Sequence, residues 1–383
     1  MSADLLVVGT GLIGTSIGLA LRGQADVVLH DPDPTAVAVA VDRGAGRRWD
    51  GREAFAHCLV AAPPSAVAAV VRELVVRELV VRGLDADATF SHVASVQRAV
   101  HADLAAAGLP LERICGSHPM AGKELSGPAA ASGDLFAGRP WVLCPSGETS
   151  AQALEAVRRV AQQCAGEPVV MTAQEHDAAV ALVSHLPQVA ASAVAAVLAG
   201  TDGPLALAGP GLQDTTRVAA SDPRLWVEVL RQNAAAVAPL VRALGAELAA
   251  AADALDRLAA DPCADPAAVE DLLRRGNIGR RRVPRKRGEH DRDFVLVSVA
   301  VPDRPGQIAG VLASAADAGI NVEDVRVEHL PGRPTGVIEL LVHPDSQVEA
   351  RRALATAGWD VVGGAPSVGA SSAPEPPVPP QLG

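Results

Sequence analysis

The stretch GSHPMAGKELSG, residues 116–127, gathers polar and reactive side chains in a chain otherwise rich in alanine and valine. Pro119 favours an extended backbone at His118, so the predicted strand ICGSH ends there. A histidine at the end of a strand can take a proton near neutral pH. By residue type alone, His118 is equally a turn residue, and Lys123 with Glu124 is equally a solvated pair in a loop.

Polar residues also stand out in three other stretches: SHVASVQ (91–97), SHLPQ (184–188) and GPGLQDTTRVAASDPRLW (209–226). Arg217 lies among uncharged residues, and its guanidinium is suited to bidentate binding of a carboxylate. A lone arginine on a helix is, however, usually a surface charge. His185 lies on an alanine-rich helix and is either a substrate contact or a buried histidine satisfied by its neighbours.

A glycine-rich turn near the N-terminus predicts a dinucleotide site. Gly9, Gly11 and Gly14 form G-x-G-x-x-G between a predicted strand and a predicted helix, and an aspartate ends the next strand 22 positions after the first glycine. The three glycines permit the tight turn, the approach of the pyrophosphate and the close packing of helix on strand. The Asp31 carboxylate would bind the ribose hydroxyls and repel a 2′-phosphate, which favours NAD over NADP. We predict Gly9, Gly11, Leu12, Ile13, Gly14, Asp31 and Pro63 as cofactor-binding residues, with a ligand-free glycine turn and a capping aspartate as the alternatives.

Three folded regions must position these residues. Strands and helices alternate over residues 1–168, which predicts an α/β Rossmann-type doubly wound sheet. Residues 169–288 are alanine-rich with helical periodicity and predict an all-α second domain. Residues 293–363 predict a β-α-β-β-α-β unit, a small ferredoxin-like α+β domain. The Pro- and Ser-rich residues 364–383 predict a disordered tail.

Composition narrows the classes of partner. The formal net charge is −11 and the isoelectric point is about 5.4, which argues against nucleic acid or an anionic membrane as the main partner. The five cysteines fall at unrelated spacings with no metal-binding pattern, so we expect reduced thiols and no metal site. The N-terminus runs straight into a predicted strand, and no apolar run approaches the roughly 18 to 20 residues of a membrane span, so we expect a cytoplasmic protein.

Four ordered motifs together resemble the prephenate/arogenate dehydrogenase family of tyrosine biosynthesis. They are VVGTGLIGTSIGLAL, GSHPMAGKELSG…LFAGRPWVL, VSHLPQVAASA and GLQDTTRVAASDPRLW. The likeness runs from about residue 4 to 287 and includes the basic segment GNIGRRRVPRKRG, which is therefore not interpreted as a nucleic-acid patch. Residues 294–362 resemble an ACT domain, a small regulatory module that binds amino acids.

The resemblance implies an NAD-dependent oxidative decarboxylation of a cyclohexadienyl substrate, either prephenate or arogenate. His118 matches the histidine that deprotonates the substrate hydroxyl, and Ser95 matches the serine that supports this hydrogen bond. Arg217 matches the arginine that holds a substrate carboxylate. The remaining predicted substrate-side residues are His185, Lys123 and Gln188.

The resemblance also implies regulation and assembly. In the ACT domain, "DRPGQIA" and "AGIN" fall where such domains commonly bind amino acids, and we expect tyrosine to bind there and inhibit. The predicted effector residues are Asp303, Pro305, Gly306 and Asn321. We expect the helical domain to form a homodimer and to build the substrate cleft.

The sequence departs from the family pattern on the substrate side. His92 and Gln97 stand where the family commonly has aspartate and lysine, Gln188 replaces a second histidine, and Lys123 replaces threonine or serine. One alternative is a non-catalytic NAD-binding sensor that signals through its ACT domain. Another is a relative of the β-hydroxyacid or 6-phosphogluconate dehydrogenases, which use a lysine of the helical domain; this chain has no lysine between residues 123 and 286.

Overall fold

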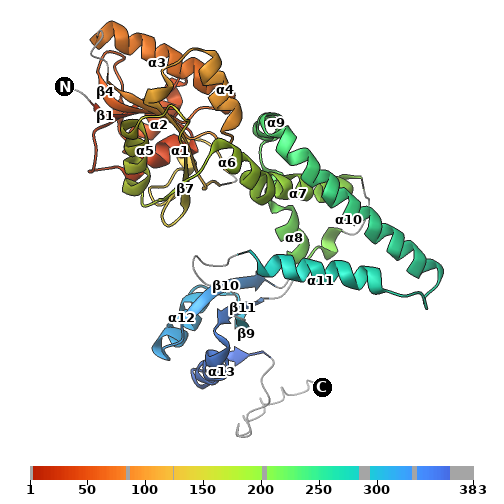
Figure 1. Cartoon of the computed structure of the whole chain (residues 1–383). Helices are drawn as coiled ribbons and strands as arrows, with labels where there is room; N and C mark the ends of the chain where they lie inside the picture. The colour runs from red at the N-terminus through yellow and green to blue at the C-terminus, as the bar shows by residue number, and fades with distance from the viewer. Residues whose placement is uncertain are drawn as a thin grey trace, which may run out of the picture. The chain divides into compact units, whose positions relative to one another are not determined.

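The computed structural model describes residues 3–82, 87–123, 125–200, 205–283, 294–329 and 334–362. The chain (Figure 1) divides into two compact units, Met1–Asp256 and Arg257–Gly383. Glu124, most of the basic segment before the third predicted domain and the predicted disordered tail lie outside the described residues.

The larger unit begins with an eight-stranded sheet in the order β3-β2-β1-β4-β5-β6-β7-β8 (Figure 1). Its strands are β1 (Ala3–Val8), β2 (Val27–His30), β3 (Arg47–Arg48), β4 (Phe55–Val60), β5 (Thr89–His92), β6 (Ile114–Pro119), β7 (Pro140–Cys144) and β8 (Glu167–Val170). The pairs from β3 to β6 are parallel, and β7 runs antiparallel to β6. The strand order reverses between β1 and β4, and ligands of such sheets bind at the carboxyl ends beside this point. The predicted doubly wound α/β fold is confirmed.

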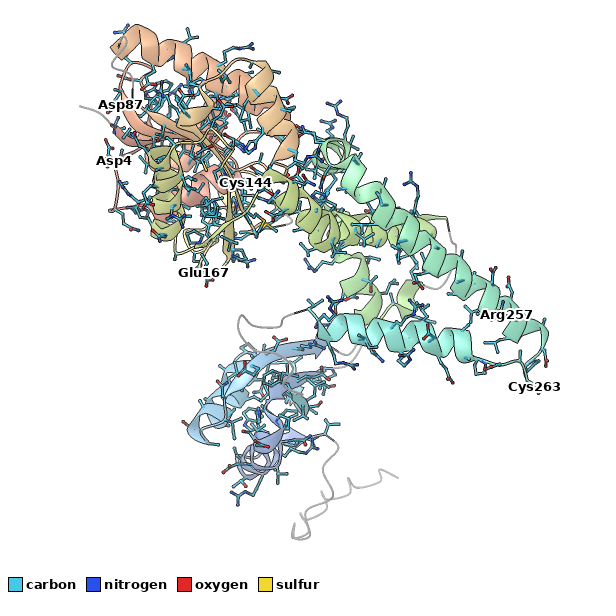
Figure 2. The ribbon with its side chains drawn as sticks, in the orientation of Figure 1. Asp4, Asp87, Cys144, Glu167, Arg257 and Cys263 are labelled. Atoms are coloured by element: carbon cyan, nitrogen blue, oxygen red, sulfur yellow. The ribbon has the colours of Figure 1, made fainter. Side chains whose placement is uncertain are left out.

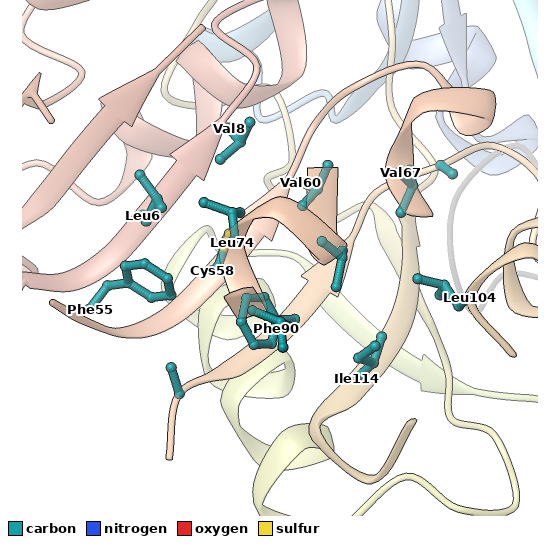
Figure 3. Packing of buried hydrophobic residues seen from close by; sticks show 14 of the residues in the cluster. Leu6, Val8, Phe55, Cys58, Val60, Val67, Leu74, Phe90, Leu104 and Ile114 are labelled. Atoms are coloured by element: carbon teal, nitrogen blue, oxygen red, sulfur yellow. The ribbon is translucent and has the colours of Figure 1, made fainter. Parts of the chain in front are cut away.

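Helices cover both faces of this sheet. They are α1 (Leu12–Ala20), α2 (Pro34–Asp42), α3 (Val67–Arg82), α4 (Arg98–Ala106) and α5 (Ala151–Gln163). Because side chains alternate along a strand, Leu6 of β1 packs under α3 and α4, while Val7 packs under α1, α2 and α5. Figure 3 shows the first of these two cores, in which Phe90 of β5 lies among aliphatic side chains. The sheet is therefore buried on both faces, and only its edges are open to ligands.

The second region is helical, as predicted. It contains α6 (Ala173–Val180), η5 (Ala181–His185), α7 (Leu186–Ala199), η6 (Leu205–Leu207), α8 (Pro210–Thr216), η7 (Arg217–Ala220), α9 (Pro223–Gln232) and α10 (Ala234–Ala260). Thr172 and Glu175 form a complete capping box at the start of α6. The segment η5 is a turn of π-helix that ends just before Pro187, whose ring nitrogen has no proton to donate to the preceding turn.

Two helical stretches are long and apolar enough to cross a membrane by length and composition, Ala173–Ala199 and Ala234–Ala260. The expectation that no apolar run approaches a membrane span is therefore wrong, because these alanine-rich helices reach the required length and mean hydropathy without a block of large apolar residues. Helices in the cores of soluble proteins reach the same length and hydropathy. The first stretch carries His176, Asp177 and His185, all buried among polar partners within the protein.

The smaller unit holds α11 (Ala267–Arg281) and a β-α-β-β-α-β domain. The latter consists of β9 (Val295–Pro302), α12 (Gln307–Asp317), β10 (Val322–His329), β11 (Thr335–Val342), α13 (Gln347–Thr356) and β12 (Asp360–Val361). Its antiparallel sheet has the order β10-β11-β9-β12, which confirms the predicted ferredoxin-like unit and fits an ACT domain. The four predicted effector residues lie in the two loops that flank α12: Asp303, Pro305, Gly306 and Asn321.

All five cysteines are free thiols. Cys58, Cys115, Cys144 and Cys164 are buried, and Cys263 is exposed between α10 and α11, where Figure 2 labels it. Burial raises the pKa of the Cys115 and Cys164 thiols to about 12, so both are uncharged at neutral pH. The structure therefore agrees with the prediction of unpaired cysteines.

Candidate active site

The glycine turn between β1 and α1 has the geometry of a nucleotide-binding loop. Gly9 has φ +100°, and a Cβ there would lie 2.3 Å from the carbonyl oxygen of Ala61. A Cβ on Gly14 would lie 1.9 Å from the carbonyl oxygen of Gly9, so helix and strand could not pack as they do. A Cβ on Gly11 would meet no atom within 4 Å. Two glycines are thus required by the fold, whereas the third leaves open space above the turn.

The surroundings of this turn fit a bound dinucleotide. Helix α1 begins at Leu12, and no side chain caps it, so the N–H groups of Leu12 and Ile13 remain available to a phosphate. Asp31 follows β2 and accepts the amides of Thr10 (2.7 Å) and Asp33 (2.9 Å), one on each carboxylate oxygen. Each of these oxygens keeps a second lone pair for a ribose hydroxyl. Asp31 therefore orders the glycine turn, and it can also bind a ligand.

His118 lies at the carboxyl end of β6, on the same edge of the sheet as the glycine turn. Its Nδ1 is 2.9 Å from Nε2 of His176, and the two rings meet edge to face with centroids 5.1 Å apart. The other ring nitrogen, Nε2, has no hydrogen-bond partner among the residues that the structure describes. His118 is therefore held from one side and can accept a proton on the other.

Asp177 completes a chain of three residues behind His118. Its Oδ1 is 2.8 Å from Nδ1 of His176 and also accepts the amide of Gln97 at 2.8 Å. Its Oδ2 accepts the amide of Arg98, the first residue of α4, at 3.0 Å. Burial acts to raise the pKa of Asp177, but the hydrogen bonds from His176, Arg98 and Gln97 outweigh it and hold the pKa below the usual value. Asp177 is therefore an ionised carboxylate at neutral pH.

His118 is neutral at physiological pH. Burial, followed by the nearby imidazoles of His176 and His185, lowers its pKa to about 3, against the opposing effect of Asp177. A neutral imidazole is the form that acts as a base. The negative charge of Asp177 would stabilise the imidazolium that forms once His118 takes a proton.

His185 is another buried histidine of this site, with 2% of its surface exposed. It ends the π-helical turn, and its Nδ1 lies 3.2 Å from Nδ2 of Asn233. Asn233 also donates to the main-chain oxygen of Asp177 at 2.8 Å. The edge of the His185 ring meets Trp226 at a centroid distance of 5.9 Å. Burial lowers the pKa of His185, so this imidazole is also neutral.

The other predicted substrate-side residues lie on four different segments of the larger unit. Gln188 is buried on α7 and donates to Ser192 Oγ at 3.4 Å. Lys123 is exposed, and its Nζ donates to the carbonyl oxygen of Ala130 at 3.0 Å. Ser95 is half-buried in the loop between β5 and α4, where the described residues offer its side chain no hydrogen bond. Arg217 is exposed on η7, which packs against α7.

Comparison with known proteins identifies the family of the chain. The family description "prephenate dehydrogenase, nucleotide-binding domain" matches residues 17–170, and "prephenate dehydrogenase, dimerization domain" matches residues 172–264. A probable prephenate dehydrogenase of Streptomyces niveus is 35% identical over 346 residues, which cover 88% of this chain and 94% of that protein. The chain belongs to the prephenate dehydrogenase family.

Solved structures of this family have the same architecture. The prephenate dehydrogenase of A. aeolicus, in complex with hydroxyphenyl propionate and NAD+, is 26% identical, with a TM-score of 0.61 over 73% of this chain and 97% of that one. The arogenate dehydrogenase of Synechocystis is also 26% identical, with a TM-score of 0.57 over 72% of this chain and 98% of that one. The protein is thus an oxidoreductase of the prephenate/arogenate dehydrogenase family, and the alternative β-hydroxyacid and 6-phosphogluconate relationships are set aside.

The two residues that depart from the common pattern of the family before α4 have structural partners. Gln97 donates from Nε2 to the carbonyl oxygens of Ala94 (2.7 Å) and Ser117 (3.0 Å), which ties this loop to β6. His92 is fully buried, and burial, followed by the charge of His101, lowers its pKa to about 3. Gln97 therefore supports the strand that carries His118, and His92 is a neutral imidazole. Among the described residues, Nε2 of His92 and Oε1 of Gln97 are buried without a hydrogen-bond partner.

Sequence reasoning missed three residues of this site, His176, Asp177 and Asn233. The sequence EHD at 175–177 could have indicated a catalytic pair, because it places a histidine beside an aspartate in the first turns of a predicted helix. The structure shows that both residues are buried. Asn233 carried no signal, since a lone asparagine at a helix end is a common cap.

Proposed function

We propose that the protein catalyses the NAD-dependent oxidative decarboxylation of prephenate to 4-hydroxyphenylpyruvate in tyrosine biosynthesis. The observation that carries the proposal is the neutral His118, held by His176 at the sheet edge that also bears the glycine turn. The Streptomyces niveus relative, named a probable prephenate dehydrogenase, supports prephenate as the substrate. Arogenate is the alternative on the same scaffold, and the Synechocystis structure supports it.

NAD fits the turn because the space above Gly11 is open, α1 is uncapped and Asp31 is acidic. When bound, NAD supplies the acceptor for the hydride that leaves the carbinol carbon of the substrate. The Asp31 carboxylate, which follows β2, would bind the ribose hydroxyls of NAD and would repel the 2′-phosphate of NADP. We therefore assign NAD as the preferred cofactor.

His118 performs the proton transfer of the reaction. Its Nε2 accepts the proton of the substrate hydroxyl as the C–H bond of the carbinol carbon breaks. The electron pair of the bond to the leaving carboxylate then enters the ring, carbon dioxide departs and the ring becomes aromatic. The imidazolium of His118 is stabilised through His176 by the charge of Asp177, and its proton returns to the phenolic oxygen or to water. Arg217 is assigned to a substrate carboxylate, with Ser95, Lys123, His185 and Gln188 around it.

An absorbance assay at about 340 nm, the band of a reduced nicotinamide, tests this function. We expect reduction of NAD with prephenate, a lower kcat/KM with arogenate, and a much lower kcat/KM with NADP because of the Asp31 carboxylate. A higher kcat/KM with arogenate would assign the protein as an arogenate dehydrogenase. No reduction with either substrate would contradict both assignments and favour the non-catalytic sensor.

We further propose that tyrosine binds the ACT domain and inhibits the enzyme. The loops that flank α12 carry Asp303, Pro305, Gly306 and Asn321, and Gly306, with φ +89°, is the N-cap of this helix, which no side chain caps. We expect added tyrosine to lower the rate of the full chain and to have no such effect on a chain truncated near residue 292. An equal response of both chains would contradict this assignment.

We propose that the helical region after the Rossmann-type sheet forms a homodimer. The family match to residues 172–264 carries the description of a dimerization domain. On α10, Leu248 and Leu255 are 61% and 56% exposed, as expected of a face that a second copy would cover. We retain cytoplasmic localisation as part of the proposal, with no nucleic acid and no membrane as partner, from the net charge of −11.

A further inference from the structure

Two neutral histidines of the site hold only one described hydrogen bond each, and both bonds are made through Nδ1. His118 Nδ1 meets His176, and His185 Nδ1 meets Asn233. The two Nε2 atoms have no hydrogen-bond partner among the described residues. Neither atom is fully buried, so each can be reached by a ligand. A neutral imidazole carries one proton, and its position decides whether Nε2 donates or accepts.

The proton of His118 is fixed by a chain that starts at the Asp177 carboxylate. An ionised carboxylate only accepts, so His176 must carry its proton on Nδ1, 2.8 Å from Oδ1 of Asp177. Nε2 of His176 then holds a lone pair and accepts, so His118 must donate from Nδ1 across the 2.9 Å bond. His118 therefore presents a lone pair at Nε2.

The position of the proton on His185 is fixed, through Asn233, by the main-chain oxygen of Asp177. The carbonyl oxygen of Asp177 only accepts, so Asn233 must turn its NH2 group toward it, at 2.8 Å. The second hydrogen of this NH2 group faces Nδ1 of His185, 3.2 Å away, and Nδ1 must accept it. His185 therefore carries its proton on Nε2 and presents a donor.

We propose that Asp177 sets opposite tautomers in the two histidines, through its carboxylate for His118 and through its main-chain oxygen for His185. His118 then serves as the base, and His185 as a hydrogen-bond donor to a carbonyl or carboxylate oxygen of the substrate. Asp177, His176 and Asn233 are positioning residues, because none of them needs to touch the substrate. The two roles rest on the proposed function, whereas the tautomers themselves do not.

The tautomers are measured directly by long-range ¹H–¹⁵N NMR of the full chain labelled at histidine nitrogen, without substrate. Protonated and unprotonated ring nitrogens have distinct ¹⁵N shifts, and spectra of His118→Asn and His185→Asn assign the two rings. We expect a protonated Nδ1 in His118 and a protonated Nε2 in His185. The same tautomer in both rings, or the reverse assignment, would overturn the proposal.

Asp177→Asn tests the cause. The asparagine side chain has only one oxygen to accept the amides of Gln97 and Arg98, so its NH2 group faces one of these amides in either orientation. When the NH2 group takes the place of Oδ1, it donates to Nδ1 of His176. The protons of His176 and His118 then move to the opposite ring nitrogens. We expect a population of His118 protonated at Nε2 and a fall in kcat of about 10²- to 10⁴-fold. The NAD dissociation constant should not change.

Glu175→Gln is the matched control, because it makes the same chemical change two residues away, and glutamine also completes a capping box. We expect its histidine shifts and kcat to equal those of the wild type. If Asp177→Asn retains a single His118 tautomer and a kcat within about twofold of the wild type, the proposal is wrong. Should Asp177→Asn not fold, the wild-type spectrum still decides.

Asn233→Ala tests the link from the main-chain oxygen of Asp177 through Asn233 to His185. Removal of its NH2 group leaves His185 free to adopt either tautomer, so we expect ring ¹⁵N shifts of His185 that are averaged between the two tautomers, a raised KM and a smaller change in kcat. A single protonated Nε2 in this variant would overturn the role of Asn233. Turnover of neither substrate together with the expected tautomers would contradict only the proposed function; turnover with reversed tautomers would contradict only this inference.

Discussion

His118→Asn is expected to lower kcat by about 10²- to 10⁴-fold and to leave the NAD dissociation constant unchanged. The asparagine NH2 group can still donate to Nε2 of His176, so the buried chain keeps its hydrogen bond. What is lost is the basic nitrogen that takes the substrate proton. Steady-state rates of NAD reduction, with fluorescence titration of the cofactor, measure the two quantities separately.

His343→Asn is a suitable control, because His343 lies in the smaller unit, beside Phe294. Its kcat should equal that of the wild type. A His118 variant that keeps kcat within about twofold of the wild type would show that another group takes the proton.

The pH profile of the wild type follows from the same residue. A base acts when neutral, so activity falls as the pH drops through its pKa. Because burial and the neighbouring imidazoles lower the pKa of His118 to about 3, kcat/KM should show no histidine limb down to about pH 5. A limb near the usual histidine pKa would contradict the assignment of His118 as a buried base.

Gly14→Ala and Gly11→Ala are expected to separate stability from cofactor binding. The new Cβ at Gly14 would lie 1.9 Å from the carbonyl oxygen of Gly9, so α1 must move off β1, and we expect the free energy of unfolding to fall by about 1–3 kcal/mol or more. The new Cβ at Gly11 meets no protein atom within 4 Å, and its φ of −73° suits alanine. We expect unchanged stability but NAD binding weaker by about tenfold or more, since the methyl group occupies the place of the pyrophosphate.

Urea unfolding and cofactor titration provide the two measurements. Gly245→Ala is the matched control, since Gly245 lies in α10 with no atom within 4 Å of its Cβ position. This variant should leave NAD binding unchanged and stabilise slightly, because alanine favours a helix. If Gly11→Ala binds NAD as tightly as the wild type, the cofactor does not lie over this turn.

Local sequence pattern was sufficient for the parts of the site that depend on backbone conformation. The spacing of Gly9, Gly11 and Gly14 predicts the turn, and Pro119 places His118 at the end of its strand. The alternation of apolar residues predicts the sheet and its helices, because periodicity reports which face is buried. These features involve residues close together in the sequence.

The rest of the site depends on contacts that no local pattern encodes. His118 and His176 are 58 residues apart, and Asn233 and Asp177 are 56 apart. His118 and His176 meet because α6 packs beside α4 and β7, and Asn233 reaches Asp177 from the end of α9. A single sequence gives no measure of this packing. The need for glycine at Gly116 was missed for the same reason: a Cβ there would lie 2.3 Å from Gln97 Oε1, a residue of another segment.

The double use of Asp177 has a mechanical consequence. The carboxylate that holds the two imidazoles is also bonded to the first turn of α4, which belongs to the nucleotide-binding half of the larger unit. Separation of α6 from α4 would break these hydrogen bonds. The carboxylate of Asp177 would then no longer hold His176, and His118 would lose the partner that fixes its proton on Nδ1.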